Sequence, residues 1–147
     1  MHTLMTNSIS ILTIEEKMLY GTYCLENFCI KYNIVNHHID DLIAYLRSIF
    51  TYEYPDAWHE DLESISFLGD LWDIPPDLDA VVPEDVRNEF YDLAAEVYHI
   101  GSADLYACPS QAPYDTLMRV ISVLKKNDIS LPDIELARTG KKSIFPA

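Results

Sequence analysis

The chain has 147 residues, 49% of them apolar, and a formal net charge of −14. This length suits one domain and the apolar fraction allows a packed core, which argues against disorder and against a scaffold that depends on disulfides. The negative charge disfavours binding to nucleic acid or to an anionic membrane through a basic surface, because phosphates would be repelled.

The cysteines and the N-terminus indicate a reducing compartment. Cys24, Cys29 and Cys108 are odd in number, and Cys24 and Cys29 are separated by about 140° around a predicted helix, so they are not expected to pair. We expect three buried free thiols. No signal-peptide pattern precedes Lys17 and no apolar run approaches the ~20 residues of a membrane span, so we expect a cytoplasmic protein.

The first predicted helix covers residues 14–32. Thr13 and Glu16 form a capping-box pattern at its start, and Asn33 is a suitable C-terminal stop. Its apolar stripe, about 100° wide, comprises Ile14, Met18, Gly21, Leu25, Phe28, Cys29 and Tyr32.

A second helix is predicted over residues 37–51, with Asn36 as its N-cap and an apolar stripe from Ile39 to Phe50. The short link at 33–36 indicates an antiparallel helical hairpin. The following segment, 52–82, is interrupted by Gly69, Pro75 and Pro76. We expect it to be an ordered, packed loop with a short helix at about 55–64.

Two further helices are predicted over residues 83–100 and 111–126. Pro83 fits the first position of the former and Gly101 its end. Ser110 is the expected cap of the latter, and Lys125 and Lys126 suit its C-terminal end.

The expected fold class is therefore all-α. We predict an irregular bundle of four to five helices with a long acidic loop and a single core. Residues 1–147 form one helical domain, with 1–12 and 133–147 loosely ordered. A short strand pairing near 103–108 or 129–136 stays an alternative.

The charge is concentrated in the middle of the chain. Residues 53–96 contain fourteen acidic residues and one base, Arg87, a net of −13, whereas residues 1–52 have a net of −2 and residues 97–147 of +1. A solvated acidic face with no partner is the simplest interpretation of such a segment. The concentration of negative charge in one segment also suggests a binding surface.

Four acidic residues recur at helical spacing within this segment: Asp85, Glu89, Asp92 and Glu96. On one helix they would form an acidic stripe whose members repel each other, and an incoming surface of Lys and Arg would relieve the repulsion. Tyr and Trp beside complementary charge are typical anchors of protein interfaces. The partner-binding surface is predicted to include these four together with Asp56, Trp58, Glu60, Asp61, Glu63, Asp70, Trp72 and Asp73.

No catalytic or metal-binding motif stands out. A carboxylate pair carries little information among fourteen acidic residues, His37 and His38 lack metal-ligand spacing along the chain, and no phosphate-binding glycine loop is present. A Cys/His nucleophile would depend on residues that meet only in space, and core packing explains the cysteines better. We therefore expect no catalytic residues, no metal and no cofactor.

The run from Tyr20 to Cys29, followed by an Asn-capped helix and an acidic loop with Trp and Pro, resembles small bacterial proteins found as candidate immunity proteins of polymorphic toxin systems. This resemblance implies a cognate inhibitor, made in the producer's cytoplasm, that occludes a basic toxin domain. The resemblance assigns no function to any individual residue of this chain.

The sequence thus favours a non-enzymatic, immunity-type inhibitor that binds and neutralises a basic protein through an acidic surface. One alternative is a nucleic-acid mimic that inhibits a DNA-binding enzyme. Others are a helical adaptor or homodimer, and a small enzyme of unrecognised type, which would need a deep pocket with convergent polar groups.

Overall fold

The computed structural model describes residues 9–48, 74–102 and 112–138. Within these ranges every regular element is a helix, which confirms the predicted all-α bundle. Five α-helices and two 3-10 turns follow one another in the order α2 (Ile14–Tyr32), α3 (His37–Arg47), α6 (Pro76–Val81), η4 (Glu84–Val86), α7 (Arg87–Ser102), α8 (Ala112–Lys126) and η5 (Ile134–Leu136).

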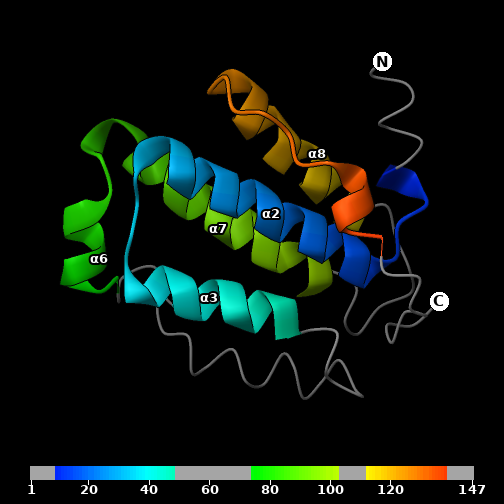
Figure 1. Cartoon of the computed structure of the whole chain (residues 1–147), viewed down its shortest axis with the longest axis horizontal. Helices are drawn as coiled ribbons and strands as arrows, with labels where there is room; N and C mark the ends of the chain where they lie inside the picture. Colours follow the sequence, from blue (N-terminus) through cyan, green and yellow to red (C-terminus); the bar gives the residue numbers. More distant parts are fainter. Residues whose placement is uncertain (1–8, 49–73, 103–111, 139–147) are drawn as a thin grey trace.

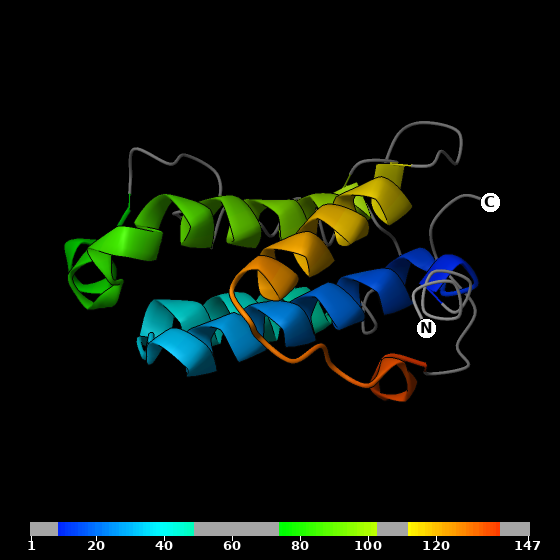
Figure 2. The same cartoon turned by 90° about the horizontal axis from the view of Figure 1, so that it is seen from above.

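Helix α2 lies at the centre of the bundle. It packs against α3, α7 and α8, and α7 also packs along α8. In Figure 1 α3 returns antiparallel to α2, and α6 lies at the end of the molecule where α3 and α7 begin. Figure 2 shows two layers, the α2–α3 hairpin and the α7–α8 pair. The arrangement therefore places the starts of α3, α6 and α7 close to one end of the molecule.

Local capping signals account for the limits of α2. The backbone N–H of Glu16 donates to Thr13 Oγ1 at 3.1 Å, and Glu16 Oε1 accepts from the backbone N–H of Thr13 at 2.9 Å. Asn33 ends the helix in the left-handed conformation, with φ of 54°, which Asn tolerates better than most residues. The predicted bounds of this helix, 14–32, are thus confirmed.

Helix α3 begins where the sequence predicted. The backbone N–H of His38 donates to the side chain of Asn36, the N-cap, at 2.9 Å. The helix extends to Arg47, and the last part of the predicted 37–51 range lies outside the described residues. The predicted hairpin between α2 and α3 is present.

The predicted third helix begins later than expected. Pro83 is followed by the 3-10 turn η4, and regular α-helix begins only at Arg87. Helix α6 occupies the end of the segment that was expected to be a loop, while residues 49–73, including the predicted helix at 55–64, lie outside the described residues. The last helix, α8, agrees with the prediction to within a residue, although Ser110 is not described.

The buried apolar side chains form one contiguous cluster in the described part of the chain. Phe28 of α2 stacks on Phe90 of α7, with ring centroids 6.1 Å apart, and contacts Tyr32 one turn further on. Gly21 lies at a close approach of α2 and α7, because a Cβ atom added there would lie only 2.8 Å from Ile100 Cδ1. The glycine therefore sets the spacing between these two helices.

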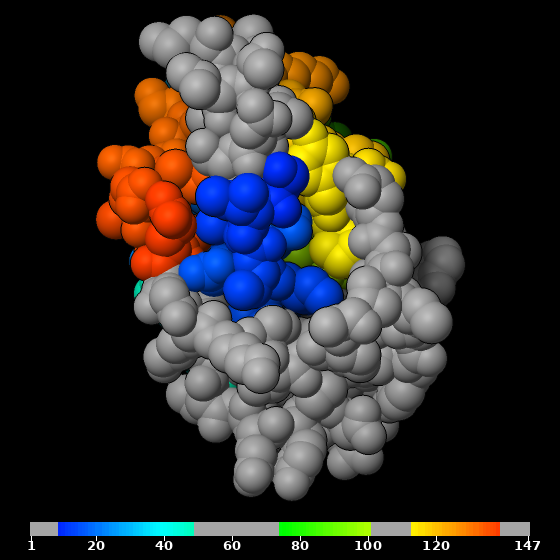
Figure 3. All heavy atoms as spheres, turned by 90° about the vertical axis from the view of Figure 1, so that its right-hand side faces the viewer, coloured from blue at the N-terminus to red at the C-terminus, as the bar shows by residue number. Residues whose placement is uncertain are grey.

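The segments before α2 and after α8 contribute to this core, although the sequence suggested loosely ordered ends. Ile9, Leu12 and Ala137 are buried. In Figure 3 the segment that begins at Ile9 (blue) lies between the start of α8 (yellow) and η5 (orange-red). The Tyr20 hydroxyl donates to the carbonyl of Pro132 at 2.9 Å, and this hydrogen bond holds the segment after α8 against α2.

Cys24 and Cys29 are buried free thiols, as predicted, while Cys108 lies outside the described residues. Burial raises the pKa of Cys24 well above its usual value and that of Cys29 to about 12. Both thiols therefore stay protonated at neutral pH and are poor nucleophiles. In the described ranges, no helix combines the length and the apolar character needed to cross a membrane.

Candidate functional site

The predicted partner-binding surface divides into a described and an undescribed part. The members that precede α6 lie outside the described residues, so their positions stay predictions: Asp56, Trp58, Glu60, Asp61, Glu63, Asp70, Trp72 and Asp73. The four residues of the acidic stripe are described, and they do not form the uniform surface that the helical spacing suggested.

Asp85 does not lie on the same α-helix as the other three residues of the stripe. It lies in η4, before the regular turns of α7 begin, and its side chain is exposed. The other three residues belong to α7. The regular spacing in the sequence thus crosses a change of helix type, which a helical wheel cannot show.

Glu89 is part of an internal network. Its carboxylate pairs with Nζ of Lys126, the last residue of α8, at 3.2 Å and accepts from Nδ2 of Asn127, the residue after that helix, at 2.8 Å. Asn127 in turn accepts a hydrogen bond from the hydroxyl of Tyr32 on α2. Glu89 therefore connects three helices, and its primary role is structural.

Glu96 also has a partner within the molecule, since Arg119 Nε of α8 donates to its Oε2 at 3.1 Å. Asp92, between the two paired glutamates, is exposed and has no cationic partner among the described residues. These acidic residues, Arg119 and apolar groups of both helices surround a hollow of about 220 Å³ along the α7–α8 seam.

The expectation that the acidic stripe waits for cations from another protein therefore does not hold for Glu89 and Glu96. Helix α8 supplies those cations. The two glutamates are held to different degrees. Glu89 also receives a hydrogen bond from the part-buried Asn127, whereas Glu96 and Arg119 are 34% and 59% exposed. An exposed pair of this kind contributes about 0.2–1 kcal/mol, so it can exchange its partner at low cost.

A second acidic group lies where α6 and η4 meet the start of α7. Asp79 is internally satisfied, because Arg87 Nε lies 3.2 Å from its Oδ1 and the Tyr91 hydroxyl donates to the same oxygen at 3.1 Å. Burial and this hydrogen bond to Asp79 raise the pKa of Tyr91. The neighbouring Glu84 and Asp85 are exposed and have no cationic partner among the described residues.

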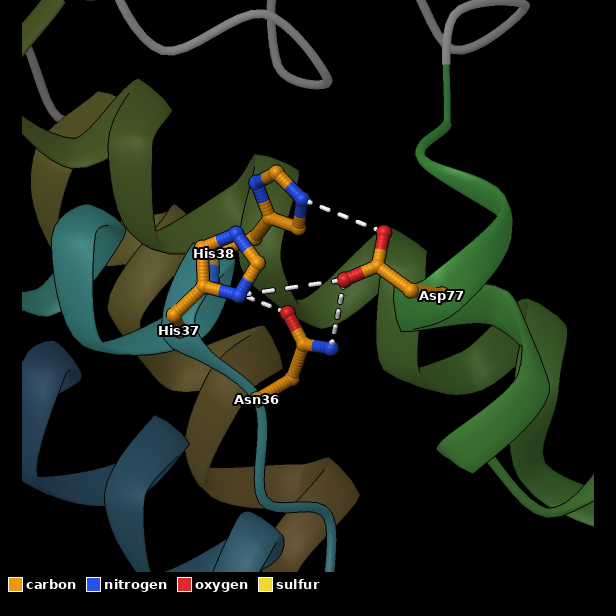
Figure 4. A network of polar contacts seen from close by, with 4 residues as sticks. All are labelled: Asn36, His37, His38 and Asp77. Atoms are coloured by element: carbon orange, nitrogen blue, oxygen red, sulfur yellow. Dashed lines mark hydrogen bonds and ion pairs between the residues drawn. The ribbon is translucent and has the colours of Figure 1, made fainter.

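A polar cluster joins α6 to the start of α3 (Figure 4). Asp77 receives a hydrogen bond from Asn36 Nδ2 at 3.2 Å and faces both His37 and His38. The hydrogen bond from Asn36 and the neighbouring histidines hold the pKa of Asp77 below its usual range. His37 and His38 were not expected to bind a metal, because they lack metal-ligand spacing along the chain. Asp77 lies far from them in the sequence, so no local spacing could have revealed this cluster.

One apolar groove is open at the surface of the α2–α3 hairpin. It has a volume of about 310 Å³ and its lining includes Ile34, Ile39 and Ile43. Ile30 and Val35, at its edge, are 76% and 72% exposed. This is the kind of surface that the adaptor or homodimer hypothesis requires.

In comparisons with known proteins, no family model, no curated protein and no solved structure matches this chain.

Proposed function

We propose that this protein is a non-catalytic inhibitor of the immunity type, which binds a basic protein toxin through the acidic surface around η4 and α7. The observation that carries the proposal is the excess of carboxylates that remains after internal pairing. Residues 74–102 contain seven acidic residues and one arginine, and in the described part of the chain Arg119 and Lys126 of α8 pair with two of these acidic residues, Glu96 and Glu89.

The carboxylates left over define the surface. We name Glu84, Asp85 and Asp92 the acidic ridge, since all three are exposed and lack a cationic partner among the described residues. Glu84 and Asp85 are adjacent in η4 and Asp92 lies further along, in α7. Three like charges without cationic partners among the described residues give a negative potential that attracts a basic partner and speeds its association. This ridge replaces the four-residue stripe as the centre of the proposed interface.

The pairing of Glu96 with Arg119 fits the same proposal. Because Arg119 is 59% exposed and Glu96 is 34% exposed, a Lys or Arg of the partner can reach Glu96 while Arg119 turns towards water. Glu89 is excluded from this role, because its network with Asn127 and Tyr32 holds the helices together.

The experiment tests neutralisation directly. The protein encoded by the adjacent gene is expressed in a bacterial host, alone and together with this chain, and growth is measured. We expect growth arrest in the first case and recovery in the second. The purified pair should bind with an affinity that falls as the salt concentration rises, because exposed charges are screened.

Charge-reversal variants locate the interface. Replacing Asp85 and Asp92 with Lys should slow association by about tenfold or more and abolish recovery of growth, because the partner's cations would then be repelled. Glu135→Lys is a control with one reversed charge on η5, at the opposite end of the molecule from α6 (Figure 1), and should leave binding unchanged. An adjacent protein that is harmless, or one neutralised equally well by the Asp85/Asp92 variant, would overturn the proposal.

A further inference from the structure

Two histidines and one aspartate meet at the junction of α3 and α6. His38 Nε2 lies 3.3 Å from Asp77 Oδ1, and His37 Nδ1 lies 3.8 Å from Asp77 Oδ2. One ligand atom from each residue can be chosen so that all three lie within 4.8 Å of one another. Figure 4 shows the two rings side by side and facing the carboxylate across the gap between the helices.

We propose that His37, His38 and Asp77 bind one divalent transition-metal ion of the Zn²⁺ class. Imidazole nitrogens with a carboxylate oxygen are a usual donor set for this ion, and three protein ligands leave its fourth position to water. The inference is independent of the proposed function.

The distances suit such an ion. With metal–ligand bonds of about 2.0–2.2 Å in a tetrahedral arrangement, two ligand atoms lie roughly 3.3 Å apart. The separation between His38 and Asp77 already has this value. The His37 ring lies slightly further away, and its side chain is 68% exposed, so rotation of this side chain alone can bring its nitrogen closer.

Asn36 forms hydrogen bonds that hold two of the proposed ligands, Asp77 and His38, in place. Its amide Nδ2 donates to Asp77 Oδ2, and its Oδ1 accepts from the backbone N–H of His38. One side chain therefore orients the carboxylate and fixes the backbone that carries the imidazoles. Hydrogen bonds of this kind commonly orient the ligands of bound metal ions.

The surrounding charge favours a cation. The start of α3 carries a partial positive charge of roughly half a unit from the helix dipole. Asp40 and Asp41 follow within the next turn and outweigh it, and Asp41 lies on the same face as His37 at i, i+4. The local excess of negative charge therefore favours a bound cation at this site.

The test uses the full chain without any affinity tag, titrated calorimetrically with Zn²⁺ alone. We expect one saturable site, and a weaker affinity by about 10–100-fold or more in His38→Ala and in Asp77→Asn. Two matched controls should bind as the parent does: His99→Ala, an exposed histidine of α7, and Asp92→Asn, which removes the same charge as Asp77→Asn. Circular dichroism of each variant checks that the helices are intact.

Two further measurements decide the identity of the ligands. Zn²⁺ should raise the melting temperature of the parent but not that of Asp77→Asn, because a ligand that binds only the folded state stabilises it. The Co²⁺ complex should lack a thiolate charge-transfer band. Absence of saturable Zn²⁺ binding, an Asp77→Asn variant that binds as tightly as the parent, or a thiolate band would overturn the proposal.

Discussion

Replacement of Gly21 with Ala tests the close approach of α2 and α7. The added methyl group would lie 2.8 Å from Ile100 Cδ1 and 3.4 Å from Val97 Cγ1. Carbon atoms in favourable contact lie about 3.5–4.0 Å apart, so the Ile100 side chain or the helices themselves must move.

The expected magnitude follows from two opposing effects. Overpacking a core by one methyl group costs about 1–3 kcal/mol. Alanine gains roughly 0.8–1.0 kcal/mol over glycine in a helix interior. Gly21→Ala should therefore lower the free energy of unfolding by about 0–2 kcal/mol, despite its better helix propensity.

A second substitution separates these effects. Ile100→Val removes the atom that the new methyl group would meet, at a cost of about 0.5–1.5 kcal/mol on its own. In that background Gly21→Ala should increase stability, by up to about 1 kcal/mol. The change of sign corresponds to a coupling energy of about 1–3 kcal/mol between the two positions.

Urea denaturation of the four proteins of this cycle, followed by far-UV circular dichroism, measures all these quantities. The reasoning would be refuted by a Gly21→Ala substitution that has the same effect in both backgrounds. It would then follow that the contact between Gly21 and Ile100 does not set the helix spacing.

Three other predictions concern stability. Thr13→Ala should lower the free energy of unfolding by about 0.5–2 kcal/mol through loss of the capping box with Glu16, and an unchanged urea midpoint would exclude that role. Glu89→Ala should cost about 1–3 kcal/mol because it leaves part-buried donors unsatisfied, whereas the exposed Asp92→Ala should stay within about 0.5 kcal/mol; equal urea midpoints would contradict the distinction. Because burial raises the pKa of Cys29 to about 12 and an unfolded thiol titrates near ~8.5, the unfolded chain releases this proton first as pH rises. Stability should therefore fall above about pH 8.5 by up to about 1.4 kcal/mol per pH unit, and a stability–pH curve that Cys29→Ala does not flatten would refute this.

Features that depend on neighbouring residues in the chain were predictable. The start and end of α2 follow from Thr13, Glu16 and Asn33, which act on backbone groups within one turn. The same local logic located Asn36 at the start of α3. The start of α7 was less predictable, because Pro83 suits either a 3-10 turn or an α-helix.

The candidate site was harder to predict because its charges interact across helices. A helical wheel of α7 shows the repulsion among Glu89, Asp92 and Glu96 but contains nothing about α8. Arg119 and Lys126 meet the two glutamates only after the helices have packed. The same limit concealed Asp77, whose approach to the histidines depends on how α6 folds back on α3.

The central position of α2 has a consequence for how the protein is made. A ribosome releases the chain from its N-terminus, so the apolar face of α2, which ends at Tyr32, emerges well before α7 begins at Arg87 and before α8 ends at Lys126. At a synthesis rate of about 5–20 residues per second, the delay is on the order of 5–20 s. Until α7 has emerged, α3 is the only one of the described helices packed against α2 that is available to cover this face. The half-made chain is therefore expected to bind chaperones that hold exposed apolar segments.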